Sequence, residues 1–201
     1  MQITTIDQLR ALYDQPVERV IRKDIGHIDQ HIAQLISLSP FVVIASANDA
    51  NEHDASPRGG APGFVKVLDT HTLLIPDSAG NNRLDTLENI LSCQQIGLLF
   101  LVPGVEETVR VNGRARLSTQ ADWLAMCAHD KRQPKLVIQV QVEQAYLHCA
   151  KALMRSKLWS AQAQVDRSSL PSLGQIIKDQ LNLPGPVETQ QQMRERYLKI
   201  L

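Results

Sequence analysis

The stretch from Glu107 to Leu117 alternates between apolar and polar side chains, with Val109, Val111 and Ala115 on the apolar positions. Successive side chains of a β-strand point to opposite faces of the sheet. The stretch therefore predicts a strand that packs one face on a core and presents a polar face elsewhere. A chain that contains it has to fold around a sheet.

Further strands are predicted where short runs of β-branched and aromatic residues lie between turn residues. These runs span residues 41–45, 64–68, 72–75, 96–102 and 136–142. The second and third form a hairpin around residues 69–71. Because helices are predicted at both ends and few βαβ units occur, we expect a mainly β (α+β) fold: a six-stranded antiparallel barrel with flanking helices.

We interpret residues 1–201 as a single domain with a helical N-terminal segment (about 1–38) and a helical C-terminal tail (about 168–201). Ile28, Ile32 and Ile36 recur at helical spacing and predict one amphipathic helix. Residues 47–63 are polar and rich in Gly and Pro, so we expect an ordered turn there.

Composition narrows the function classes. The formal net charge is zero, which argues against a nucleic-acid-binding barrel. The three cysteines form no CxxC pair, and no apolar run has the length of a membrane span, so we expect a cytoplasmic protein without membrane attachment. His27 and His31 lie four residues apart, but no third ligand is evident and we predict no metal site.

The loop before the helix predicted from Leu84 is the first candidate site. Asn81 or Asn82 is a suitable N-cap residue, and Gly80 allows the backbone to turn. Backbone N–H groups at a helix start bind anions. The spacing therefore indicates an anion site at this helix.

Arg83 falls in the expected first turn of that helix, where a cation opposes the helix dipole. Its position makes sense if an anion sits between the guanidinium and the helix N-terminus. Alternatively, Arg83 points into solvent or pairs with Asp77 or Glu88.

Two further cations, Arg58 and Lys66, lie before and within the predicted strand 64–68. Lys66 lies within a predicted strand, so it either faces solvent or points at a negative group. Arg58 stands beside two glycines and could reach a phosphate; alternatively it belongs to a flexible surface loop.

Taken in order, several motifs resemble the pyridoxamine-5′-phosphate-oxidase-like FMN-binding family over roughly residues 20 to 160. The motifs span Asp54–Gly60, Phe64–Asp69, Leu74–Asp77, Gly80–Ile90, Gly97–Gly104 and Glu107–Gly113. The resemblance implies a split barrel that forms a homodimer with FMN between the subunits. Ala61 stands where the oxidase itself has an arginine, so the resemblance does not extend to its substrate.

The same resemblance implies roles for individual residues. Val65 and Lys66 would lie on the strand beside FMN, and Ile75 and Pro76 would touch the flavin through the main chain. Thr108 would contact the flavin ring. The loop that holds the phosphate would consist of Asn81, Asn82 and Arg83.

A third candidate follows the last predicted strand. Lys151 and Arg155 lie at i and i+4, so they share a helix face and repel each other unless an anion lies between them. Trp159 could wall a flavin or substrate pocket by stacking. Alternatively, this is a surface helix with Trp159 in the core.

Together these features predict an FMN-dependent oxidoreductase that passes hydride or electrons to or from a small-molecule substrate. The alternative is a non-catalytic flavin carrier, store or redox sensor. The residues alone leave both open.

Overall fold

A computed structural model of the chain describes residues 2–78, 80–129 and 132–199. Its contacts divide the chain into two compact units, Met1–Ala152 and Leu153–Leu201. Within the described residues, no helix is both long enough and apolar enough to cross a bilayer.

The first unit contains the sheet. Its strands are β1 (Phe41–Ala47), β2 (His53–Gly59), β3 (Lys66–Asp69), β4 (Thr72–Pro76), β5 (Gln95–Leu101), β6 (Thr108–Ser118) and β7 (Val137–His148). Its helices are α1 (Ile6–Arg10), α2 (Glu18–Arg22), α3 (Gln30–Leu38), α4 (Asp85–Cys93) and α5 (Ala121–Met126). Helix α6 (Lys151–Ser156) crosses the division between the units.

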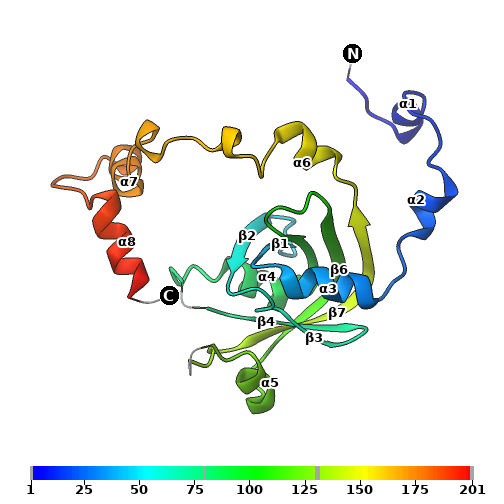
Figure 1. The fold of residues 1–201 in the computed structure, drawn as a ribbon, viewed down its shortest axis with the longest axis horizontal. Coiled ribbons are helices and arrows are strands. Elements are labelled where there is room, and N and C mark those ends of the chain that lie inside the picture. Colours follow the sequence, from blue (N-terminus) through cyan, green and yellow to red (C-terminus); the bar gives the residue numbers. More distant parts are fainter. Residues whose placement is uncertain (1, 79, 130–131, 200–201) are drawn as a thin grey trace. The chain divides into compact units, whose positions relative to one another are not determined.

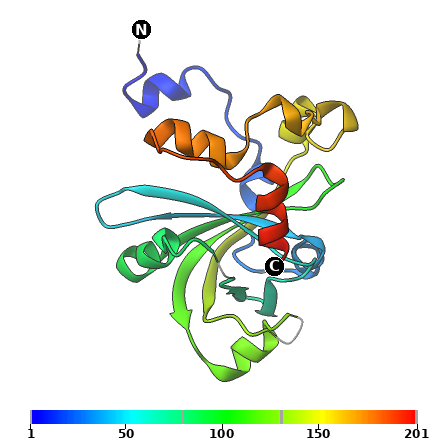
Figure 2. The same cartoon turned by 90° about the vertical axis from the view of Figure 1, so that its left-hand side faces the viewer.

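The described strands form one sheet in the order β2-β1-β5-β6-β7-β4-β3, and every neighbouring pair is antiparallel. Figures 1 and 2 show the long strands β6 and β7 side by side and strongly curved. The predicted mainly antiparallel sheet with flanking helices is confirmed. The predicted number of six strands is wrong, because seven are present among the described residues.

The additional strand is β2, where the sequence predicts a turn. Its residues alternate between exposed and half-buried, but the half-buried positions are polar, so no apolar pattern marks the strand. It lies at the edge of the sheet and pairs only with β1. Pro57 fits there because an edge strand has a side without ladder hydrogen bonds.

Strands β6 and β7 pair along almost their whole length, with a register shift between Asn112 and Gly113. A Cβ atom at Gly113 would collide with the carbonyl oxygen of Gln141. Glycine is therefore required where the two backbones approach each other. Strand β7 continues to His148, six residues beyond the predicted end at Val142.

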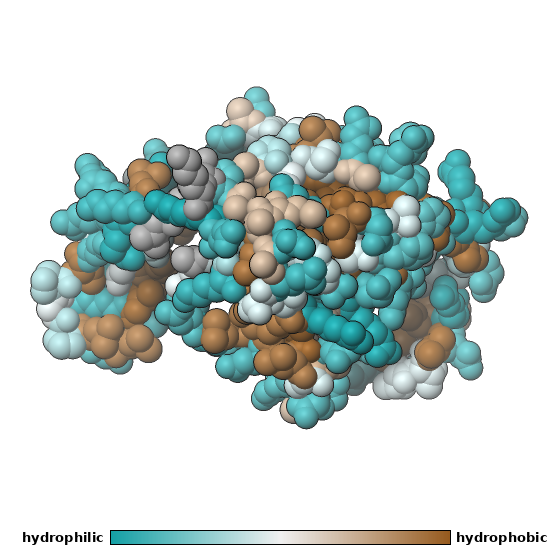
Figure 3. All heavy atoms as spheres, turned by 90° about the horizontal axis from the view of Figure 1, so that it is seen from below, coloured by the Kyte–Doolittle hydropathy of each residue, from teal (hydrophilic) through white to brown (hydrophobic). Residues whose placement is uncertain are grey.

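The N-terminal helices bury none of their side chains. Ile6 on α1 and Ile21 on α2 are 75% and 62% exposed. On the face drawn in Figure 3, hydrophobic side chains form separate patches among hydrophilic ones. The apolar residues of α1 and α2 thus contribute little to the core of the first unit.

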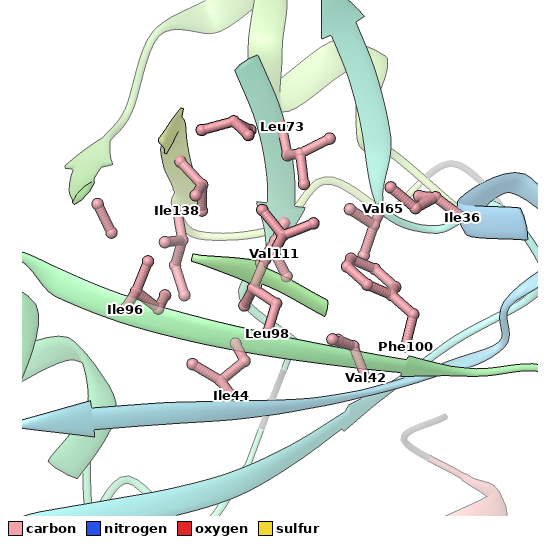
Figure 4. Close-up of a cluster of buried hydrophobic side chains, with 14 of the residues drawn as sticks. Ile36, Val42, Ile44, Val65, Leu73, Ile96, Leu98, Phe100, Val111 and Ile138 are labelled. Carbon is pink, nitrogen blue, oxygen red and sulfur yellow. The ribbon is translucent and has the colours of Figure 1, made fainter. Parts of the chain in front are cut away.

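The core lies on the inner face of the curved sheet. Figure 4 shows Ile44 of β1, Leu98 and Phe100 of β5 and Leu73 of β4 converging from different strands, with Ile36 of α3 beside them. All five are at most 2% exposed. Each buried side chain of this size stabilises the fold by about 1.5–3 kcal/mol relative to exposure.

The second unit consists of short helical pieces: η1 (Ala161–Ala163), η2 (Arg167–Ser169), α7 (Leu173–Leu181) and α8 (Gln190–Leu198). Ser172 caps α7, and Thr189 caps α8 through a capping box with Gln192. None of these helices buries a residue. The helices of this unit are therefore stabilised by their caps and not by a buried core.

Candidate functional site

The loop before α4 is shaped by two left-handed residues, Asn82 and Leu84, with φ of 60° and 63°. The side-chain oxygen of Asn81 accepts a hydrogen bond from the backbone N–H of Arg83 at 3.0 Å. The helix begins at Asp85, and its N-cap Leu84 makes no side-chain hydrogen bond to the first turn. The prediction that Asn81 or Asn82 caps the helix is therefore wrong. The N-cap position is Leu84, and the Asn81 side chain bonds to a backbone N–H within the loop instead.

Arg83 lies two residues before the helix rather than in its first turn. Its Nε donates to Oδ2 of Asp85 at 2.8 Å, and its side chain is 73% exposed. The partner is thus Asp85, not Asp77 or Glu88. The hydrogen bond to Asp85 raises the pKa of Arg83, so the guanidinium is permanently charged at the helix entrance.

A polar network fixes the start of α4 to the edge strand β2. Oδ2 of Asp54 accepts a hydrogen bond from the Thr86 hydroxyl at 2.6 Å, and Oδ1 accepts one from Ser56 at 2.9 Å. Thr86 is 1% exposed. Sequence reasoning did not identify Asp54 and Thr86 as positioning residues, because the Asp-x-Ser alternation is informative only once β2 is known to be a strand.

Arg58 lies on the same face of β2 as Asp54 and is half-buried. It donates to the carbonyl oxygen of Pro57 at 3.0 Å. Burial raises the pKa of Asp77, which follows β4, while the charges of Arg58 and Lys135 act in the opposite direction. Arg58 therefore lies within electrostatic reach of the loop that leads to Arg83.

Lys66 begins β3, and its Nζ donates to the carbonyl oxygen of Gly63 at 2.8 Å. It pairs with Leu74, whose side chain packs against Cys127 on the outer face of the sheet. Burial raises the pKa of the Cys127 thiol, and the charge of Lys66 opposes that rise. The Lys66 side chain is thus on the outer face, away from the main core.

The apolar residues of the predicted site have buried side chains. Val65 and Ile75 belong to the main core, at 3% and 0% exposure. Pro76 is buried where β4 pairs with β7. A ligand beside these residues could reach their main chain but not their side chains.

Thr108 lies at the opposite end of β6. The row of paired residues that starts at Lys66 passes through Leu74 and Gln139 and meets β6 at Arg116. Arg116 and Thr108 are eight residues apart, about 26 Å along a strand. In this register, Thr108 and Lys66 lie in different rows of paired residues.

The sequence profile of the pyridoxamine 5′-phosphate oxidase family matches residues 28–149, which is more than half of the chain. The chain belongs to this family. The match includes β1 to β7 and α4, and with them Arg58, Lys66, Arg83 and Thr108. The resemblance seen in the sequence is therefore confirmed. No curated protein sequence matches the chain significantly.

Similar solved structures include HupZ of Group A Streptococcus, with 18% identity over 60% of this chain and 93% of that chain, at a TM-score of 0.48. An FMN-binding protein from Syntrophomonas wolfei has 9% identity over 58% and 83% of the two chains, at 0.47. The FAD binding protein from Mycobacterium smegmatis has 16% identity over 62% and 97%, at 0.44.

The last three predicted site residues lie outside the part of the chain that matches the pyridoxamine 5′-phosphate oxidase family. Lys151 and Arg155 are exposed on α6, and Trp159 is partly buried. Lys151 belongs to the first compact unit, whereas Arg155 and Trp159 belong to the second. Their roles at a cofactor remain predictions.

Among the described residues, no group of three His, Cys, Asp or Glu side chains is arranged to hold a metal ion. The rings of His27 and His71 approach to 6.1 Å between centroids.

Proposed function

We propose that this protein binds FMN between the two subunits of a homodimer and passes hydride or electrons between the flavin and a small molecule. The observation that carries the proposal is the start of α4. The N-cap residue Leu84 makes no side-chain hydrogen bond to the first turn, and the exposed cation Arg83 precedes the helix. Both lie within the residues that match the pyridoxamine 5′-phosphate oxidase family. Such a helix start suits a phosphate.

The residues around this helix fit a phosphate group. Phosphate monoesters carry a charge of about −1.5 to −2 at neutral pH. Arg58 and Arg83 supply positive charge near this helix, and Arg83 exchanges Asp85 for the phosphate. That exchange costs little, because the Arg83–Asp85 pair is exposed to solvent. The family resemblance adds Lys66 as a third cation.

The register of the sheet is compatible with a dimeric site, because Thr108 and Lys66 lie in rows eight residues apart along β6. In the proposed dimer, Lys66 of one subunit and Thr108 of the other contact the same flavin. In this arrangement the sheet curls into a split barrel, residues 1–201 act as one functional domain, and the dimer works in the cytoplasm.

When bound, FMN supplies the redox chemistry by accepting hydride at N5. The protein supplies binding and orientation. Arg58, Lys66 and Arg83 offset the phosphate charge, the main chain at Ile75 and Pro76 lies against the ring system, and the partner's Thr108 hydroxyl offers a hydrogen bond at its edge. Lys151, Arg155 and Trp159 are further cofactor contacts that the sequence predicts.

The proposal is tested by titrating the purified protein with FMN and following the flavin absorption spectrum. We expect saturable binding by a dimer, weakened about tenfold or more by Arg83→Gln or Lys66→Gln. Arg22→Gln is the matched control, because Arg22 is also exposed and ion-paired, with Glu18. A folded protein that binds no FMN would refute the proposal.

A second measurement separates an enzyme from a carrier. Anaerobic mixing of the FMN-loaded protein with NADH, NADPH or reduced F420 should bleach the flavin absorption within seconds to minutes. If FMN binds but no donor in a wide panel reduces it, the protein is a flavin carrier, store or sensor.

A further inference from the structure

A groove of about 400 Å³ lies between the N-terminal segment and the far end of β7. Val20 and Ile21 line it from α2, and Tyr146 and His148 line it from β7. The Tyr146 and His148 rings are 5.2 Å apart between centroids, at an angle of 57°. Its size and its mixture of apolar, aromatic and polar walls suit a small organic molecule.

Two cations border the aromatic wall. Nζ of Lys23 lies 5.2 Å from the centroid of the Tyr146 ring, and Cζ of Arg110 lies 5.8 Å from it. Lys23 donates to the carbonyl oxygen of Leu147 at 2.8 Å, and Arg110 donates to Asn112 at 3.3 Å. Within the described part of the chain, neither cation forms an ion pair with a carboxylate.

The carboxylate that lines this groove is Asp24. Its Oδ1 accepts hydrogen bonds from the backbone N–H groups of Gly26 and Ala145, each at 3.3 Å. Asp24 therefore holds the backbone together instead of pairing with Lys23 or Arg110. With His148 neutral, Lys23 and Asp24 face the groove, and Arg110 adds a second positive charge beside the Tyr146 ring.

His148 adds a group that can change charge. Burial lowers the pKa of His148, and the charges of Lys23 and Arg110 lower it further. The neutral imidazole is therefore favoured, and protonation at lower pH would make it a third cation. An anion between Lys23 and Arg110 would remove part of the repulsion that keeps the ring neutral.

We propose that this groove binds a small aromatic anion, with its ring on Tyr146 and His148 and its negative group between Lys23 and Arg110. The cross-strand pairs Arg110–Tyr146 and Thr108–His148 hold these side chains on one face of the sheet. The lining residues belong to one subunit, and the groove differs from the helix start that receives the phosphate. It lies next to Thr108, which pairs with His148 and is proposed to contact FMN, so competition with FMN has to be measured.

The test uses 2-naphthoate as the probe and isothermal titration calorimetry on the full-length protein. We expect Lys23→Met and Arg110→Met each to weaken binding about tenfold. Arg114→Met is the matched control on the same face of β6, because Arg114 is paired with Glu143. Arg19→Met is the control on α2. Unchanged affinity in both Lys23→Met and Arg110→Met would overturn the proposal.

Two comparisons separate charge from apolar contact and from flavin binding. The neutral amide, 2-naphthamide, should bind about tenfold more weakly than the acid; equal affinity would refute an anion site. Saturation with FMN should leave naphthoate binding intact, whereas competition would show that the groove belongs to the flavin site. Naphthoate binding by a protein that binds no FMN would support this site and refute only the proposed function.

The pH dependence gives an independent measurement. The charged and titratable groups that face His148 are Lys23 and Asp24 from the N-terminal segment, Arg110 from β6 and Tyr146 from β7. As the pH is lowered below neutrality, protonation of His148 adds a positive charge beside the groove, so naphthoate binding should tighten. His148→Gln should abolish this tightening; if it persists, His148 does not face the ligand.

Discussion

Strands β6 and β7 resemble each other, but their two faces differ in burial and in chemistry. Val111, Ala115 and Val140 on the inner face are fully buried in the common core. On the outer face, three arginines are exposed, and each has a different neighbour. Arg110 lies over the Tyr146 ring, and Arg114 forms an ion pair with Glu143. Arg116 is the cross-strand partner of Gln139. The inner face stabilises the fold, whereas the outer face carries the candidate binding groups.

The alternation of β6 and β7 therefore encodes two kinds of information. The period of two decides which side chains are buried, and any apolar residues of suitable size satisfy the inner face. The chemistry of the outer face depends on which strand, helix or segment lies beside each polar residue. Mutations on the two faces should therefore affect different properties.

The largest expected effect comes from the inner face. Phe100→Ala removes a ring that is 1% exposed and leaves a cavity, so it should lower the free energy of unfolding by about 3–5 kcal/mol. Arg116→Ala on the outer face should change it by less than about 0.5 kcal/mol. Chemical denaturation of both variants measures the contrast, and similar losses would contradict the division between the faces.

The next effect concerns the point where the backbones of β6 and β7 approach closely, at Gly113. Gly113→Ala places a Cβ against the carbonyl oxygen of Gln141, so β6 and β7 have to separate locally. We expect a loss of about 3 kcal/mol in the free energy of unfolding. Gly80→Ala is the control, because a Cβ there meets no atom within 4 Å. Equal stability of the two variants would show that the close approach at Gly113 is absent.

Most of the sheet was predictable because its strands carry apolar or alternating residues. The runs 41–45 and 96–102 and the alternation of 107–117 correspond to β1, β5 and β6. Strand β2 was not predictable, since an edge strand needs no apolar face and Pro57 argues against a strand in the absence of its neighbour.

The candidate site was predictable only in part, for a related reason. The sequence indicated Arg83 and Lys66 as unusual cations, but it did not show that Asp85 pairs with Arg83 or that Lys66 and Thr108 lie in different rows of paired residues. Lys23 and Tyr146 are 123 positions apart, and only the fold brings them into contact. Contacts of this kind leave no local periodic pattern.

A smaller effect is expected where the edge strand meets α4. Thr86→Val removes the hydroxyl that donates to Asp54 and leaves that carboxylate with one donor fewer. The free energy of unfolding should fall by about 1–2 kcal/mol. Thr119→Val, at an exposed position, is the control. If the proposed FMN site is correct, Thr86→Val should also weaken FMN binding, because Thr86 positions the start of α4.

The smallest effect concerns Asp77, whose pKa is raised by burial. Because the folded state favours the protonated carboxyl, its contribution to stability is present below the ordinary aspartate pKa and is lost as the pH rises through the raised folded-state pKa. Asp77→Asn should therefore be more stable than the FMN-free wild type at pH 7, with the difference shrinking towards pH 3. Thermal unfolding at both pH values measures this, with the exposed Asp49→Asn as control. A less stable Asp77→Asn at pH 7 would mean that the attraction to Arg58 and Lys135 outweighs burial, and Asp77 would then act as an anchor for Arg58.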